Sequence, residues 1–169
     1  MTLTTHAIVG ASAATIFSFH PAAAIAAAFL SHFAIDVTPH WDYVLRSGRE
    51  DPQNPMNSDI IIGKDFIFDL TRVCVDALLG IALSLLIFFP QESYQLWIVL
   101  LGAGFGILPD PLQFAYWKIR KEPFLSLQRF HRWAHSKDKS LLGRWKIGVF
   151  YQFSLVLGFL LLTKLYFLL

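Results

Sequence analysis

Long apolar stretches dominate this chain, and polar residues are gathered between them. Residues 7–19 and 22–35 are apolar and rich in alanine, and His20-Pro21 separates them. Each stretch is shorter than the roughly 20 residues that a helix needs to cross a bilayer. Joined, they would form a helix of about 43 Å at 1.5 Å per residue, with a proline near its middle. The pattern therefore favours a helical hairpin over one long span.

Three longer apolar segments follow the hairpin. Residues 60–89 form a long helical run that ends at Pro90, and residues 94–108 form another that a Pro-Asp-Pro sequence stops. Residues 147–169 are almost unbroken in their apolar character, and their only charged residue is Lys164, near the far end, where its side chain can reach the interface. These segments predict about three longer spans.

Two polar segments connect the apolar ones. Residues 37–59 are rich in proline, glycine and asparagine, which is typical of turns. Residues 112–146 are basic, contain tryptophan and have an amphipathic pattern. The predicted fold is therefore all-α: a polytopic helical membrane protein whose single membrane-embedded domain covers residues 1–169. It combines an N-terminal helical hairpin, about three longer spans and an amphipathic cytoplasmic segment.

Composition and charge agree with a membrane protein. Hydrophobic residues make up 55% of the chain and charged residues 15%, whereas soluble domains carry about 25% charge. This argues against disorder, a coiled coil or an ordinary soluble enzyme. From Lys118 to Lys146 nine Lys/Arg stand against two acids, so this segment has a net charge of +7 and the rest of the chain −5. Beside apolar spans, such a segment indicates a cytoplasmic loop near anionic headgroups. We expect membrane lipids as partners rather than nucleic acid, and a place in a bacterial or archaeal inner (cytoplasmic) membrane.

Ionisable side chains at the ends of these segments are the candidate functional residues, because such groups are costly near a bilayer unless they are paired or bind metal. His32 and Asp36 are four residues apart, so they lie one turn apart on the same helix face. His131 and His135 repeat this spacing with two imidazoles. Either pair has a spacing suited to two metal ligands. The alternatives are a hydrogen bond between helices for the first pair and headgroup binding for the second.

Further candidates stand close to the same ends. His40 and Asp42 follow the hairpin, Asp110 lies in the Pro-Asp-Pro sequence, and His6 precedes the first apolar run. If the basic segment is cytoplasmic, all of these residues fall at the cytoplasmic side of the membrane. The predicted metal ligands are therefore His6, His32, Asp36, His40, Asp110, His131 and His135.

The long apolar run over 60–89 also contains a polar stripe. Asp65, Asp69, Arg72 and Asp76 are spaced by four, three and four residues, which places them on one helix face. Arg72 could form a buried ion pair with one of its neighbouring aspartates. Alternatively, Asp69 could serve as a ligand or a general base.

The spacing of these residues resembles a known group of hydrolases. The sequence HFAIDVTPH at 32–40 is similar to a signature of zinc-dependent phospholipase C and the related single-strand nucleases. More closely, the chain resembles the inner-membrane metal-dependent hydrolases that include the LexA-regulated bacterial membrane protein. That family has an N-terminal histidine and the motifs L-P-D-x-D-H, H-R-G-x-T-H-S and S-H-x-x-x-D-x-x-T-P. Here His6, LPD at 108–110, HRWAHS at 131–136 and SHFAIDVTP at 31–39 match them.

The resemblance implies a zinc-dependent phosphoesterase chemistry for this chain. It also shows two departures from the family pattern. The S-H-x-x-x-D motif comes first here but last in the family, and residues 111–113 replace the family's second aspartate and its histidine.

We therefore predict a membrane-embedded metal-dependent hydrolase that acts on a phosphoester of a lipid or lipid-linked substrate at the cytoplasmic face. Mixed imidazole and carboxylate ligands suit one or two Zn²⁺ ions, with Mn²⁺ or Fe as alternatives. Asp42 or Asp69 could act as the general base, and Arg132 could bind a phosphate oxygen. The alternative is a non-enzymatic protein that binds metal or transports ions along the polar stripe. A third hypothesis is a structural membrane protein in which these polar residues only join helices.

Overall fold

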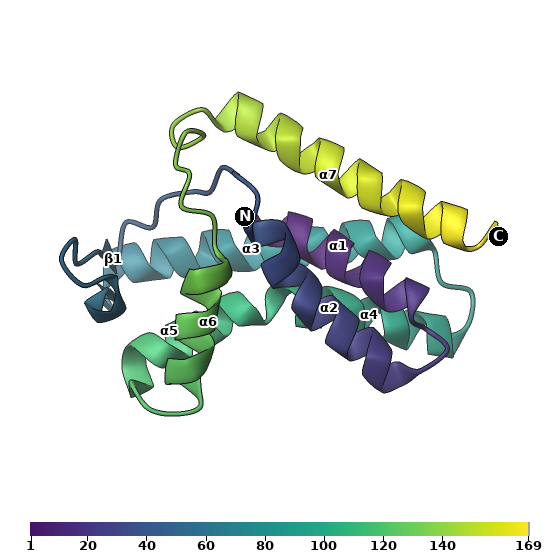
Figure 1. Ribbon diagram of the computed structural model, residues 1–169, viewed down its shortest axis with the longest axis horizontal. Helices are drawn as coiled ribbons and strands as arrows, with labels where there is room; N and C mark the ends of the chain where they lie inside the picture. The colour runs from purple at the N-terminus through teal and green to yellow at the C-terminus, as the bar shows by residue number, and fades with distance from the viewer. Residues whose placement is uncertain (169) are drawn as a thin grey trace.

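The computed structural model describes residues 1–168, which fold into helices with very little strand (Figure 1). The helices are α1 (Leu3–Ile16), α2 (Pro21–Asp36), α3 (Lys64–Phe88), α4 (Ser93–Ile107), α5 (Pro109–Ile119), α6 (Phe124–Ala134) and α7 (Trp145–Tyr166). The connection between α2 and α3 contains a short antiparallel pair, β1 (Gly48–Arg49) and β2 (Asp59–Ile60), and a 3₁₀ turn, η1 (Pro55–Asn57). The all-α prediction is confirmed, and the strand pair is an element that the pattern did not predict.

Helices α1 and α2 form the predicted hairpin. Pro21 occupies the first turn of α2, where its missing N–H costs nothing, and the His20 side chain accepts a hydrogen bond from the backbone N–H of Ala23. Near this turn Ala14 of α1 packs against alanines of α2. Helix α1 is the centre of the fold, since α2, α3, α4 and α7 all pack against it.

Glycines allow α1 and α4 to approach closely. A Cβ atom added to Gly10 of α1 would lie 2.5 Å from the carbonyl oxygen of Gly102, and one added to Gly106 would lie 2.4 Å from the carbonyl oxygen of His6. Gly102 and Gly106 form a G-x-x-x-G spacing, which is common where membrane helices cross. This crossing holds the first turns of α1 against the end of α4.

Two helices, α3 and α7, are long and apolar enough to cross a membrane. Helices α4 and α5 pass the same test only as a pair, and they are bent by 43° at Leu108. Both α3 and α7 expose large apolar side chains, such as Leu78 at 65% and Phe150 at 68%. The predicted spans thus correspond to two continuous helices and one bent pair. The predicted amphipathic segment over 112–146 divides into most of α5, all of α6 and the connection to α7.

Arg72 and Asp76, in the polar stripe on α3, do not form an ion pair with each other. The Arg72 guanidinium lies 4.3 Å from the centre of the Tyr43 ring, and it makes no ion pair within residues 1–168. Asp76 instead accepts hydrogen bonds from the backbone N–H groups of Leu3, at 2.6 Å, and Thr4, at 3.2 Å. A carboxylate in this position satisfies free N–H groups and favours the positive end of α1. The ion-pair interpretation is therefore wrong, and Asp76 caps α1.

Candidate metal centre

Asp36, the last residue of α2, lies at the centre of a buried cluster of histidines. Its side chain is 1% exposed. The Nε2 atom of His6 lies 3.3 Å from Asp36 Oδ1, and that of His40 lies 3.8 Å from the same oxygen. Asp36 Oδ2 lies 3.3 Å from Nε2 of His32 and 3.4 Å from Nε2 of His131. Both oxygens of one carboxylate therefore face two imidazoles each.

The fold delivers these side chains from separate helix ends. The antiparallel hairpin brings the start of α1, with His6, beside the end of α2, where the two imidazole rings of His6 and His32 stack with centroids 3.8 Å apart. His131 comes from the last turn of α6. The backbone N–H of Ser136 donates to the Asp36 carbonyl oxygen at 2.7 Å, which fastens the segment after α6 to the end of α2.

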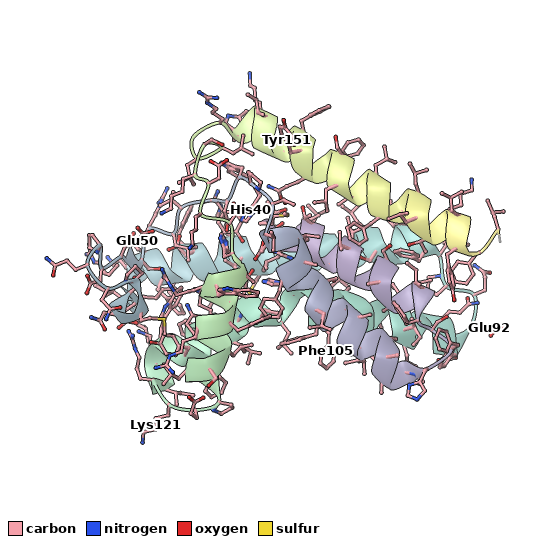
Figure 2. The ribbon with its side chains drawn as sticks, viewed as in Figure 1. His40, Glu50, Glu92, Phe105, Lys121 and Tyr151 are labelled. Atoms are coloured by element: carbon pink, nitrogen blue, oxygen red, sulfur yellow. The ribbon has the colours of Figure 1, made fainter. Side chains whose placement is uncertain are left out.

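Two further predicted ligands complete the cluster. Asp110 stands in the first turn of α5, just after the bend, and its Oδ1 lies 3.6 Å from His32 Nε2 and 3.9 Å from His131 Nε2. The ring of His135, which directly follows α6, lies 4.7 Å from that of His40. Figure 2 shows His40 near the end of α2. All seven predicted metal ligands thus meet at one place.

The seven residues form three overlapping groups whose ligand atoms lie within 4.8 Å of one another. Asp36 and His32 are each shared by two groups; the groups are His6/His32/Asp36, His32/Asp110/His131 and Asp36/His40/His135. Two ligands bound about 2.1 Å from one tetrahedral ion stand roughly 3.4 Å apart. The nitrogen–oxygen distances of 3.3–3.9 Å in the cluster agree with that separation. These buried groups can hold a metal ion.

The hydrogen bonds of the rings fix which nitrogen is free. The Nδ1–H groups of three histidines donate to backbone carbonyls: His32 to Gly106 at 2.8 Å, His40 to Thr38 at 2.7 Å and His135 to Ser136 at 3.1 Å. Because a carbonyl only accepts, Nδ1 carries the proton and Nε2 of the neutral ring presents a lone pair. A lone pair facing a carboxylate repels it unless a cation or a proton lies between them.

The surroundings of His40 and His135 oppose protonation of their rings, whereas the carboxylates of Asp110 and Asp36 raise the pKa of His32. Burial is the main cause that lowers the pKa of His40 to about 4, and the nearby amino group of Met1 adds to it. Burial also lowers the pKa of His135. Both rings are therefore neutral at pH 7. Within residues 1–168 neither ring nitrogen of His6 has a hydrogen-bond partner, although the side chain is fully buried. A metal cation would satisfy all three rings.

The remaining predicted site residues occupy different places. Asp42 lies beside the cluster, because its Oδ2 is 3.6 Å from the Met1 amino nitrogen, which is 3.4 Å from Asp36 Oδ1. Asp69 is outside the cluster, and its Oδ2 accepts hydrogen bonds from the Ser47 backbone N–H and hydroxyl at 2.8 and 2.7 Å.

Arg132 also points elsewhere. Its side chain is on the surface of α6, and its guanidinium donates to the carbonyl oxygen of Pro55 in η1 at 3.3 Å. A role in phosphate binding stays a prediction, and it would require the side chain to leave that carbonyl.

The sequence analysis did not identify Gln152, which positions the start of α1 and the segment after α2. Gln152 of α7 is 4% exposed, and its Oε1 accepts hydrogen bonds from the Thr2 backbone N–H and the Thr5 hydroxyl. Its Nε2–H donates to the Trp41 carbonyl at 2.7 Å. Gln152 thus joins α7 to the start of α1 and to the segment that carries His40 and Asp42. A lone glutamine in an otherwise apolar span was the available signal.

Comparisons with protein-family models, with curated proteins and with solved structures find no match to this chain.

Proposed function

We propose that this protein is a membrane-embedded metal-dependent hydrolase that cleaves a phosphoester of a lipid or lipid-linked substrate at the cytoplasmic face. One observation carries the proposal: seven histidines and aspartates meet in three overlapping groups around Asp36, with imidazole Nε2 atoms turned toward carboxylates. The resemblance of the motifs that contain these residues to inner-membrane metal-dependent hydrolases supports the same chemistry.

The ligand set favours zinc. Mixed imidazole and carboxylate donors suit Zn²⁺, with Mn²⁺ or Fe as alternatives. Closed structural zinc sites use four ligands, so the seven donors here are enough for two ions. Bound ions would lower the pKa of a water molecule and stabilise both the attacking and the leaving oxygen of a phosphoester.

The protein's own residues divide into a buried and an accessible side. Asp36 is 1% exposed, and each of its two oxygens faces two histidines, so this residue would help to hold the metal. The side chains of Asp110 and Asp42 are 32% and 42% exposed, so a substrate would approach from their side. Asp42 belongs to none of the three groups, and we assign it the role of general base that accepts a proton from water.

The basic segment supports a cytoplasmic placement. It includes α6 and the connection to α7, which carry His131 and His135. Excess Lys and Arg next to apolar spans is typical of the cytoplasmic side, and the same charges would attract an anionic lipid phosphate.

The transport alternative has less support. Its main argument is Asp76, deep in α3, as part of an ion path. That carboxylate is occupied by the backbone N–H groups of Leu3 and Thr4.

The test is metal content followed by hydrolysis. We would purify the protein in mild detergent without added metal, count metal ions per chain by elemental mass spectrometry and measure phosphate release from phosphatidic acid. We expect one or two equivalents of zinc or manganese and activity that a chelator abolishes. His32→Asn should lose metal, whereas His20→Asn, at the opposite end of the hairpin, should retain it. A folded protein that contains no metal and takes up no zinc would refute the proposal.

A further inference from the structure

A cavity of about 270 Å³ lies beside the metal centre, between α3, α5 and the connection that contains β1 and β2. Asp42 and Asp110 line it on one side. Most of its wall is apolar and includes Leu45, Phe66, Leu70, Val73, Phe114 and Trp117. Ligand pockets usually measure about 300–1,000 Å³ and are mostly apolar with few polar groups. This cavity has that character and is small, so it suits one slender group.

The cavity shares one lining residue with the metal centre and another with the exposed face of α3. Asp110 lines the cavity and also belongs to the His32/Asp110/His131 group. A phosphoester held at Asp110 would therefore have the cavity beside it. Leu70 lines the cavity yet is 44% exposed on α3, a helix long and apolar enough to cross a membrane. A hydrocarbon chain could enter from the bilayer past this residue.

We infer that this cavity binds one hydrocarbon chain of the substrate. The substrate class is then a phosphoester lipid of which one slender chain lies in the cavity while the phosphate lies at Asp110. The inference rests on the proposed function for the position of the phosphate, whereas binding of the chain does not require metal.

The test uses the fluorescence of Trp117. Chelator-treated protein in detergent would be titrated with 1-bromo-octane, because bromine quenches tryptophan at short range. We expect saturable quenching that Trp117→Phe removes. Val73→Phe adds bulk to the wall and should weaken binding at least fivefold. Val75→Phe, the same change at a position 60% exposed on α3, should change it less than twofold.

Should Val73→Phe not fold, Leu70→Phe serves as the second cavity-filling variant, because Leu70 also lines the cavity. It should weaken binding of the bromoalkane by the same factor.

The outcomes separate the two proposals. Quenching that does not saturate, or that Val73→Phe and Val75→Phe alter equally, overturns the cavity inference even if the protein contains zinc and hydrolyses phosphatidic acid. Saturable quenching in a protein without metal or activity supports the cavity and refutes the hydrolase.

Discussion

The two ends of the α1/α2 hairpin differ in what holds them together. At one end His6, His32 and Asp36 are fully or almost fully buried, and their partners come from α4, α5, α6 and the connection after α2. At the other end Ala14, Ala24 and Ala28 pack together, and the turn is exposed. The alanine end depends on neighbours in the same hairpin and on α4, whereas the histidine end depends on distant segments. Substitutions at the histidine end should therefore weaken metal binding, whereas substitutions at the alanine end should leave it unchanged.

The largest effect is expected from Asp36→Asn. The change keeps the size of the side chain and removes the charge that two of the three groups share. Zinc affinity should fall by at least about 100-fold, since loss of even an outer-shell partner costs 10–100-fold. Elemental analysis and competition with a zinc chelator measure this. Asp42→Asn is the matched control: metal should remain while phosphate release falls. Full zinc content in Asp36→Asn would show that Asp36 is no ligand.

The next largest effect concerns the crossing of α1 and α4 that supports the histidine end. Gly106→Ala places a methyl group 2.4 Å from the His6 carbonyl oxygen, so the helices must separate. We expect a loss of about 1–3 kcal/mol in the free energy of unfolding, as for other overpacked sites. Gly104→Ala, in the same helix with open space around it, should instead raise stability by roughly 0.5–1 kcal/mol.

Denaturant unfolding of the two alanine variants, followed by circular dichroism, measures these changes. Gly106→Ala should also weaken zinc binding, because the Gly106 carbonyl orients His32 and the crossing positions His6. Equal stability of the two variants would contradict the close approach of the backbones.

How far the sequence predicts this site depends on the range of the contacts. The hairpin and the His32/Asp36 and His131/His135 pairs follow from local spacing, which a helix converts directly into position. The seven ligands could be proposed because polar groups at the ends of apolar segments are few. The sequence does not indicate that these ligands gather around Asp36 in particular. That arrangement depends on how helices from distant parts of the chain pack together.

The errors and gaps have the same cause. Asp76 has its partners Leu3 and Thr4 more than seventy residues earlier, so its spacing to Arg72 was misleading. The bend of 43° that brings Asp110 to the cluster lies at Leu108, where a Pro-Asp-Pro sequence predicted an end and not a new helix. Asp69 and Arg132 are bound to Ser47 and Pro55, residues of a connection whose path the sequence does not specify.

A smaller effect is expected at the cap of α1. Asp76→Ala leaves the N–H groups of Leu3 and Thr4 without their carboxylate, and loss of a cap typically costs about 0.5–2 kcal/mol. Because His6 lies one turn further along α1, zinc affinity should decrease several-fold as well. Asp65→Ala is the control, since Asp65 is exposed at the start of α3. Calorimetry of zinc binding and thermal unfolding of both variants distinguish them.

The smallest effect is expected at the alanine end. His20 caps α2 through a long hydrogen bond of 3.4 Å to the Ala23 N–H and is exposed. Its replacement by alanine should change stability by less than about 0.5 kcal/mol, as is usual for surface positions, and should leave zinc content unchanged. Elemental analysis of His20→Ala beside His32→Ala makes the comparison within one helix. If His20→Ala lost metal as His32→Ala does, the difference between the two ends of the hairpin would not hold, and general damage to the hairpin would explain both.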